Sequence, residues 1–217
     1  MHLFRVIVTS VLLAFNTNAV QALSYSLERL DNGRCSRRRD CPVVFVAKGE
    51  IERRELEGFR DFVGSLNQRA AAPRAFVIDS TGGNLAGAFG LGIVLRRIGI
   101  PVIVAGVEGG KLGPGFCGSA CVFALMGGRS RQVPNGSSVA VHAPQQVPEL
   151  GQHGGEELSS SNASDRRRQI TRILTDYARR MDVDPALITL SMSVPPDEKR
   201  VLTANELRRF RLVVTAK

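Results

Sequence analysis

The sequence predicts an α/β fold with mainly parallel strands. Short apolar runs rich in β-branched residues alternate with segments of helical periodicity. Such alternation is typical of parallel sheets whose strands are joined by crossover helices. At 217 residues and 43% hydrophobic content, the chain can bury one sizeable core. We therefore expect one folded domain over residues 43–217, preceded by two short segments at the N-terminus.

Residues 1–22 are typical of a secretory signal peptide. Arg5 precedes an apolar stretch from Val6 to Phe15, and Val20 and Ala22 form a small-residue cleavage site. The apolar stretch is shorter than the roughly 20 residues that span a bilayer. We therefore expect export to the periplasm or the exterior, with an uncleaved anchor as the alternative.

Four cysteines fall in two close pairs, Cys35 with Cys41 and Cys117 with Cys121. Cysteines at such spacing fit an oxidising compartment, and pairing between neighbours is the simplest of the three possible connectivities. For Cys121 the alternative is a buried core thiol. The first pair lies in residues 23–42, which we expect to form an N-terminal extension with a cysteine loop.

The net charge of +9 raises the possibility of nucleic-acid binding. However, the basic residues are spread in short runs such as "CSRRRDC" and "SDRRRQ". No zinc-ligand spacing, RNP-like motif or helix-turn-helix pattern accompanies them. We therefore expect no nucleic-acid partner, no metal and no cofactor, while contact with an anionic surface stays open.

The first elements of the domain follow from periodicity. "PVVFVAKGEI" predicts a strand, and "AFVIDS" predicts a strand buried on both faces. The helix between them has an apolar stripe of Leu56, Phe59, Val63 and Leu66. After the break "TGGN", a second helix is expected to bury Leu85, Ala88, Gly92, Leu95 and Ile98.

The second half begins with a buried strand, "PVIVAGV", and a flexible loop, "GGKLGPG". A helix-length apolar run follows from Ala120 to Met126, and "RQVPNGSSVAVH" predicts a strand, a turn and a second strand. The polar segment from Val147 to Ser164 is expected to be a mobile loop at the lip of the site.

The C-terminal part is predicted to be helical. One long helix places its apolar residues on one side, namely Ile170, Ile173, Leu174, Tyr177 and Met181. Asp184 before Pro185 is expected to cap a short helix. Thr203 and Glu206 form a capping box for the last one.

Two junctions between a strand and a helix could carry chemistry, "DSTGGN" and "CGSACV". Gly82 and Gly83 either form a plain turn or expose backbone N–H groups for an oxyanion. Ser119 is either a helix cap or a nucleophile. It does not fit the G-x-S-x-G elbow, because Cys121 takes the second glycine's place. His142, at the end of a strand, is either a structural residue or a general base.

Taken in order, these motifs resemble the Clp-type serine peptidases of the Clp/crotonase superfamily. The resemblance is carried by "IDSTGGNLAGAFGLGIVLRRIGIPV", "CGSACVFALMGGRSRQVPNGSSVAVHAP" and "LTANELRRFRLV", and it extends from Val43 to Val213. It implies a right-handed spiral of β-β-α units. It departs from the family pattern in the inserted "EGGKLGPG" and in the cysteines that flank Ser119.

The resemblance implies a catalytic role for Ser119 as nucleophile and His142 as general base. The backbone N–H groups of Gly82 and Ala120 would form the oxyanion hole. A third group must hold the tautomer of the base, and the resemblance directs the search to "PPDEKRVLTANE". Asp197 is the preferred acid, because it is short and follows two prolines.

Three alternatives remain for this segment. Glu198 could be the acid instead of Asp197. Both acids could be solvated loop residues. Lys199 could be the base of a serine–lysine dyad.

The implied function is an exported serine hydrolase, a peptidase that forms an acyl-enzyme at Ser119. The alternative is a catalytically silent binding or assembly module on the same scaffold, because one fold hosts many functions. The expected partners are a peptide or protein substrate and further copies of the chain, since relatives form rings or trimers. No ATPase partner is expected outside the cytoplasm.

Overall fold

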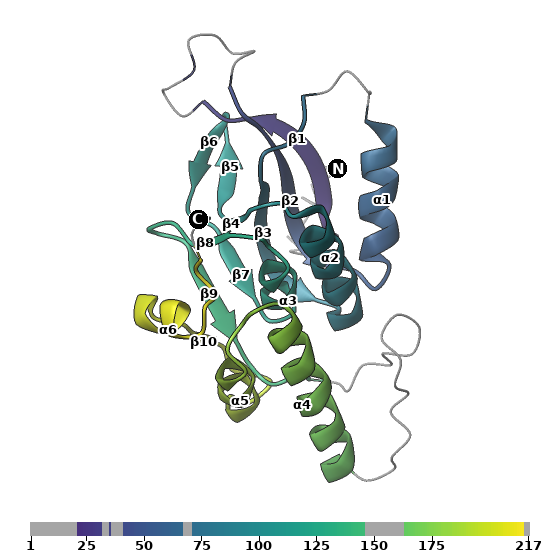
Figure 1. Ribbon diagram of the computed structural model, residues 1–217, viewed down its shortest axis with the longest axis vertical. Coiled ribbons are helices and arrows are strands. Elements are labelled where there is room, and N and C mark those ends of the chain that lie inside the picture. Colours follow the sequence, from purple (N-terminus) through teal and green to yellow (C-terminus); the bar gives the residue numbers. More distant parts are fainter. Residues whose placement is uncertain (1–20, 32–34, 36–40, 67–70, 146–162, 215–217) are drawn as a thin grey trace, which may run out of the picture.

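The computed structural model describes residues 21–31, 35, 41–66, 71–145 and 163–214. It confirms the α/β class: one branched, mixed sheet packs against helices (Figure 1). The expected signal peptide lies outside the described residues, except for Gln21 and Ala22, which pair with Glu50. The expected mobile loop also lies outside them, apart from residues 163–164 at the start of a helix.

The elements of the N-terminal half are β1 (Ser24–Arg29), β2 (Val43–Ile51), α1 (Glu55–Ser65), β3 (Phe76–Gly83), α2 (Leu85–Ile98), β4 (Val102–Val104), β5 (Gly106–Glu108) and β6 (Lys111–Gly113). The C-terminal half contains β7 (Phe116–Gly118), α3 (Cys121–Met126), β8 (Arg131–Gln132), β9 (Ser138–Val141), α4 (Ala163–Arg180), α5 (Ala186–Ser193), β10 (Arg200–Val201) and α6 (Ala204–Arg209).

Strand β3 is the branch point of the sheet. Its first part, from Phe76 to Ile78, pairs in parallel with β4, whereas Ser80 pairs with Cys117 of β7. Strand β7 pairs in parallel with β9, in the register Gly118 opposite Ala140. The carboxyl ends of β3, β7 and β9 therefore meet at one edge, where ligand sites of α/β folds gather.

Helices α2 and α3 cover the core beside this edge (Figure 1). A side chain at Gly92 of α2 would place its Cβ 2.1 Å from the Tyr177 hydroxyl and 2.6 Å from the Phe123 carbonyl oxygen. Only glycine at position 92 lets α2, α3 and α4 approach one another this closely. The predicted α2 stripe is confirmed at Leu85, Ala88 and Leu95, but Ile98 is 53% exposed at the end of the helix.

The stripe predicted for α1 is correct only in part. Phe59 is buried, but Val63 is 41% exposed. Phe62 turns inward in its place, and its ring centroid lies 5.6 Å from that of Tyr25 on β1. The helix is thus rotated toward a strand that the sequence did not predict.

That strand, β1, lies in the segment expected to be an extension. It pairs antiparallel with β2 from Ser24 opposite Lys48 to Arg29 opposite Val43. The Tyr25 hydroxyl donates a hydrogen bond of 2.6 Å to Glu55 of α1. Residues 24–29 therefore belong to the folded domain, although "SYSLER" is too polar to be recognised as a strand.

One local prediction for the middle of the chain is wrong, whereas the strand, turn and second strand predicted for "RQVPNGSSVAVH" are present. The segment expected as a flexible loop contains β6 and the turn of the β5–β6 hairpin, and this turn uses Gly109 and Gly110 at positive φ. The strands on either side of the Pro-Asn-Gly turn do not pair with each other, because β8 joins β4 and β9 joins β7. Turn residues indicate a reversal of the chain but not the partner of each strand.

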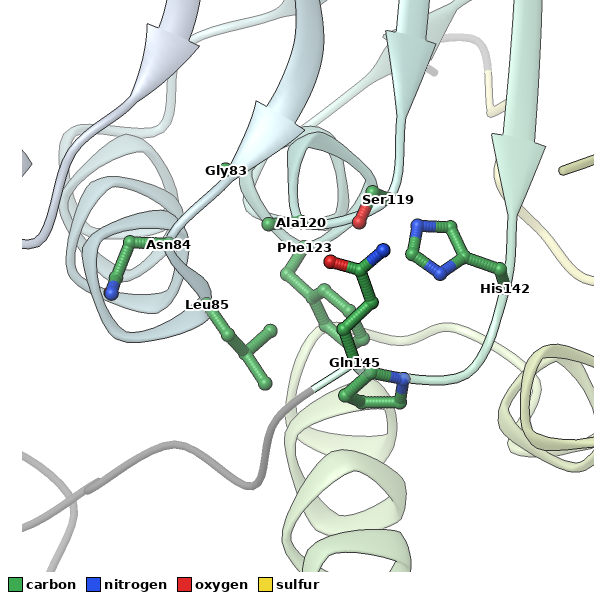
Figure 2. Close-up of a pocket in the computed structure, with 9 residues that line it drawn as sticks. Gly83, Asn84, Leu85, Ser119, Ala120, Phe123, His142 and Gln145 are labelled. Atoms are coloured by element: carbon green, nitrogen blue, oxygen red, sulfur yellow. The ribbon is translucent and has the colours of Figure 1, made fainter. Parts of the chain in front are cut away.

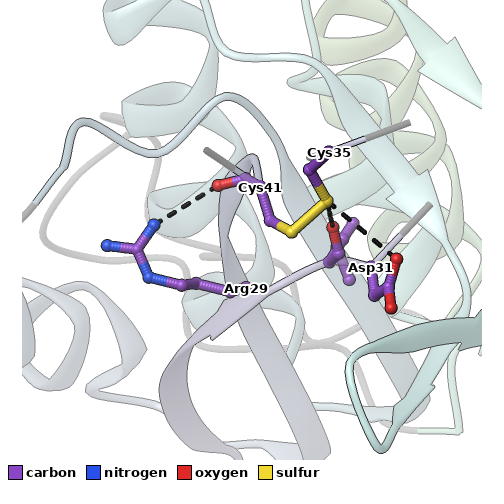
Figure 3. Close-up of a disulfide and its surroundings, with 5 residues drawn as sticks. Arg29, Asp31, Cys35 and Cys41 are labelled. Carbon is purple, nitrogen blue, oxygen red and sulfur yellow. Dashed lines mark hydrogen bonds between the residues drawn. A yellow bond between two sulfur atoms is a disulfide. The ribbon is translucent and has the colours of Figure 1, made fainter. Parts of the chain in front are cut away.

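Both cysteine pairs that the sequence favours are bonded, Cys35 with Cys41 and Cys117 with Cys121. Figure 3 shows the first disulfide, beside Asp31 and Arg29. Two disulfides are typical of proteins from oxidising compartments. In the part of the chain that the structure describes, no helix has the length and apolar character needed to cross a membrane.

Candidate active site

A pocket of about 240 Å³ opens at the edge where β3, β7 and β9 end (Figure 2). Three of the sequence-predicted site residues line it, namely Ser119, Ala120 and His142. The remaining lining residues are Gly83, Asn84, Leu85, Phe123, Pro144 and Gln145. The structure thus brings the expected nucleophile and base to one cavity.

Ser119 occupies the turn between β7 and α3 with a φ of 54°. This left-handed conformation is uncommon for a residue with a Cβ and persists only where the surroundings impose it. Here the Ser119 N–H donates a hydrogen bond of 3.0 Å to the Ala140 carbonyl of β9. The disulfide between Cys117 and Cys121 closes the same turn. The strained turn is held from both sides, and the serine side chain reaches the pocket (Figure 2).

His142 follows the last residue of β9 and is half-buried. Its Nδ1 lies 2.7 Å from the carbonyl oxygen of Ala143. A carbonyl can only accept, so Nδ1 carries the proton and Nε2 is left with a free lone pair. The ring presents Nε2 toward Ser119 (Figure 2). This is the tautomer that a general base needs.

Backbone donors lie on the other side of Ser119. The Ala120 N–H belongs to the first turn of α3, where N–H groups have no partner within the helix. Gly82, expected as the second donor, is buried, and its N–H donates a hydrogen bond of 3.2 Å to the Ser80 hydroxyl. A Cβ at Gly82 would lie 2.7 Å from the Ser119 Cβ, so the close approach of the two segments requires glycine there.

Gly83 lines the pocket, whereas Gly82 does not. The next N–H, that of Asn84, donates a hydrogen bond of 2.8 Å to Ile51 of β2. Successive N–H groups of an extended chain point to opposite sides. The Gly83 N–H therefore points away from β2, toward the side on which Ser119 lies. The structure favours Gly83 over Gly82 as the donor that faces the pocket.

The structure does not bring the expected acid to the base. Asp197 and Glu198 are exposed in and beside a turn between α5 and β10, and neither lines the pocket. Lys199 is also exposed, with its Nζ 5.7 Å from the centre of the Phe116 ring. Among the described residues, the His142 Nδ1 has a backbone carbonyl, that of Ala143, as its partner.

The apolar wall of the pocket was not recognised from the sequence. Phe123 is its largest residue and lies in α3, four residues after Ser119. That spacing was the signal that could have revealed it. Its ring centroid lies 5.3 Å from Phe89 and 5.9 Å from Tyr177. Among the described residues, no charged side chain lines the pocket. The pocket therefore suits an uncharged group of a ligand.

No family model and no curated protein matches the chain. Among solved structures, it is similar to a serine-to-alanine mutant of the 1510-N membrane-bound stomatin-specific protease, with a TM-score of 0.51 and 16% identity over 77% of this chain and 75% of that chain. A lysine-to-alanine mutant of that protease in complex with a substrate peptide gives a TM-score of 0.51 and 17% identity, over 77% and 71%.

ClpP1 from Listeria monocytogenes gives a TM-score of 0.46 and 17% identity, over 76% of this chain and 84% of that chain. At these identities, the likeness to the stomatin-specific protease concerns the fold. The expected Clp/crotonase-like fold is confirmed.

Proposed function

We propose that this protein is an exported serine peptidase that forms an acyl-enzyme at Ser119 with His142 as general base. One observation carries the proposal. A serine held at a φ of 54° and a histidine whose Nδ1 is bound to a carbonyl line the same pocket. Nucleophilic catalysis requires an oriented base beside the nucleophile, and backbone strain of this kind clusters at active sites.

The chemistry follows the serine peptidase pattern. His142 Nε2 takes the proton of the Ser119 hydroxyl as the oxygen attacks the carbonyl carbon of the scissile bond. The N–H groups of Ala120 and Gly83 stabilise the negative charge that develops on the carbonyl oxygen. The imidazolium then gives its proton to the leaving amine, and water cleaves the acyl-enzyme by the reverse proton transfers.

A peptide or protein substrate is supported by the pocket and by one structural neighbour. The pocket offers the apolar side chains of Leu85, Phe123 and Pro144, and a related fold has been seen with a substrate peptide bound. The two disulfides support an exported protein in an oxidising compartment. We also propose that the chain self-associates without an ATPase partner, which size-exclusion chromatography with light scattering tests.

A fluorophosphonate probe tests the proposal, because it labels activated serines covalently. We expect the purified protein to be labelled and Ser119→Ala to be unlabelled, with an unchanged circular dichroism spectrum. Equal labelling of both proteins would exclude Ser119 as the nucleophile. No labelling of the wild type would favour the silent binding module.

The variant His142→Ala tests whether His142 or Lys199 is the general base. We expect labelling to slow by about two to four orders of magnitude, as for the loss of a general base. Labelling that persists in His142→Ala and is lost in Lys199→Ala would favour the serine–lysine dyad. The structure supports the histidine, because His142 lines the pocket and Lys199 does not.

A further inference from the structure

We propose that Ser191 is a positioning residue for His142, and that the end of α5 does the work that a carboxylate does in a catalytic triad. In this arrangement a backbone carbonyl, that of Ala143, holds the imidazole. The inference rests on the proposed function of Ser119 and His142.

The peptide group that joins His142 to Ala143 is held at both of its polar atoms. Its carbonyl oxygen accepts a hydrogen bond of 2.7 Å from the Ser191 hydroxyl. Its N–H donates a hydrogen bond of 3.0 Å to the Val194 carbonyl. Ser191 lies in the last turn of α5 and Val194 caps that helix. One helix end therefore fixes the orientation of one peptide plane.

The next carbonyl along the chain is the acceptor for the imidazole. The Ala143 oxygen lies 2.7 Å from the His142 Nδ1. Pro144 follows Ala143, and a residue before proline is restricted to extended conformations. Ala143 is 3% exposed and Ser191 is 6% exposed, so water has little access to either group. The direction of the acceptor is thus set by the held peptide plane before it and the proline after it.

A carbonyl can fix the tautomer of a histidine as a carboxylate does, but it carries no charge. It therefore stabilises the imidazolium less, since hydrogen bonds to ionised acceptors are roughly twice as strong. Activity should then depend strongly on the orientation of this single acceptor. If the Ser191 hydrogen bond is lost, the peptide plane can rotate and the Ala143 oxygen can leave Nδ1.

The test compares Ser191→Ala with Ser193→Ala. Both serines lie on α5, and both hydroxyls donate 2.7 Å hydrogen bonds to backbone carbonyls. The Ser193 bond goes to Leu190 and leaves the His142 peptide untouched. We expect Ser191→Ala to slow fluorophosphonate labelling about tenfold, the factor that corresponds to about 1.4 kcal/mol. Ser193→Ala should label at the wild-type rate.

A second readout does not depend on activity. ¹⁵N NMR of the imidazole reports which ring nitrogen carries the proton. We expect the Nδ1–H tautomer in wild type and in Ser193→Ala, and a mixture of tautomers in Ser191→Ala. If Ser191→Ala does not fold, Ser191→Cys keeps the size and a weak donor, and both effects should then be intermediate.

The outcomes separate the inference from the proposed function. Wild-type labelling rate and an unchanged tautomer in Ser191→Ala would overturn the role of Ser191 while leaving the peptidase intact. An unlabelled wild type would overturn the peptidase, yet the NMR comparison would still decide whether Ser191 fixes the ring. Equal slowing in Ser191→Ala and Ser193→Ala would show a general effect on α5 and overturn the inference.

Discussion

Tyr177 of α4 donates a hydrogen bond of 2.8 Å to the carbonyl oxygen of Phe123, which forms the apolar wall of the pocket. The two residues are 54 positions apart in the chain. The Tyr177 ring also stacks on Phe89, with centroids 4.2 Å apart. Helix α4 therefore fixes the part of α3 that lines the pocket.

Tyr177→Phe tests this bond, because it keeps the ring and removes only the hydroxyl. The Phe123 carbonyl would be left buried without its donor, which costs about 1–3 kcal/mol. We expect a loss of that size in the free energy of unfolding, measured by urea denaturation. An unchanged unfolding midpoint would show that another donor replaces the hydroxyl.

The disulfide between Cys117 and Cys121 is expected to support activity more than stability. Each disulfide closes a short loop, with separations of 4 and 6 residues. Both should contribute about 2 kcal/mol by the chain-entropy estimate. Only the Cys117–Cys121 bond encloses Ser119, so its loss should also relax the strained turn.

Two double variants separate these effects. We expect Cys117→Ala with Cys121→Ala to slow fluorophosphonate labelling at least tenfold. Cys35→Ala with Cys41→Ala should lower the melting temperature to a similar degree and leave the labelling rate unchanged. Equal labelling rates in the two double variants would show that the turn holds its shape without the disulfide.

Asp197→Asn is expected to behave like the wild type. The residue is exposed outside the pocket, and the Nδ1 of His142 already donates to a carbonyl. The labelling rate and the pH dependence of labelling should both be unchanged, and Glu198→Gln should give the same result. A steep loss in Asp197→Asn alone would show that its turn closes on His142 during the reaction.

The capping box of α6 should make stability depend on acid pH. The N–H and the hydroxyl of Thr203 both donate to Glu206, at 2.9 and 3.0 Å. These bonds from Thr203 hold the pKa of Glu206 below its ordinary value of 4.5. A carboxyl with a depressed pKa stabilises the fold above the pKa of the unfolded state. That stability is lost as the pH falls through the folded-state pKa.

Glu206→Gln tests this dependence. Its melting temperature should fall below that of the wild type at pH values above about 5, and the difference should shrink toward about pH 3. Glu198→Gln is a control, because that carboxylate lies outside the capping box. A constant difference between Glu206→Gln and the wild type across this range would contradict the assignment.

Much of the fold could be predicted because local patterns report which side of an element faces the core. The buried strands β2 and β3, helix α2 and the apolar side of α4 follow from periodicity. The capping box of α6 follows from a four-residue pattern. Strand pairing did not follow, as β1 and β8 show, because a strand pattern does not identify the neighbouring strand.

The candidate site also combines features that the sequence predicts with features that only the tertiary structure reveals. The sequence by itself determined the turn at Ser119 with its cysteines and the histidine at the end of a strand, because glycine, serine and strand-end patterns are local. Only the tertiary structure decided that Gly83 faces the pocket and that Asp197 does not. It also decided that a helix end holds the peptide after His142. Hydrogen-bond partners distant in the chain are set by how the elements pack, and no local pattern encodes that packing.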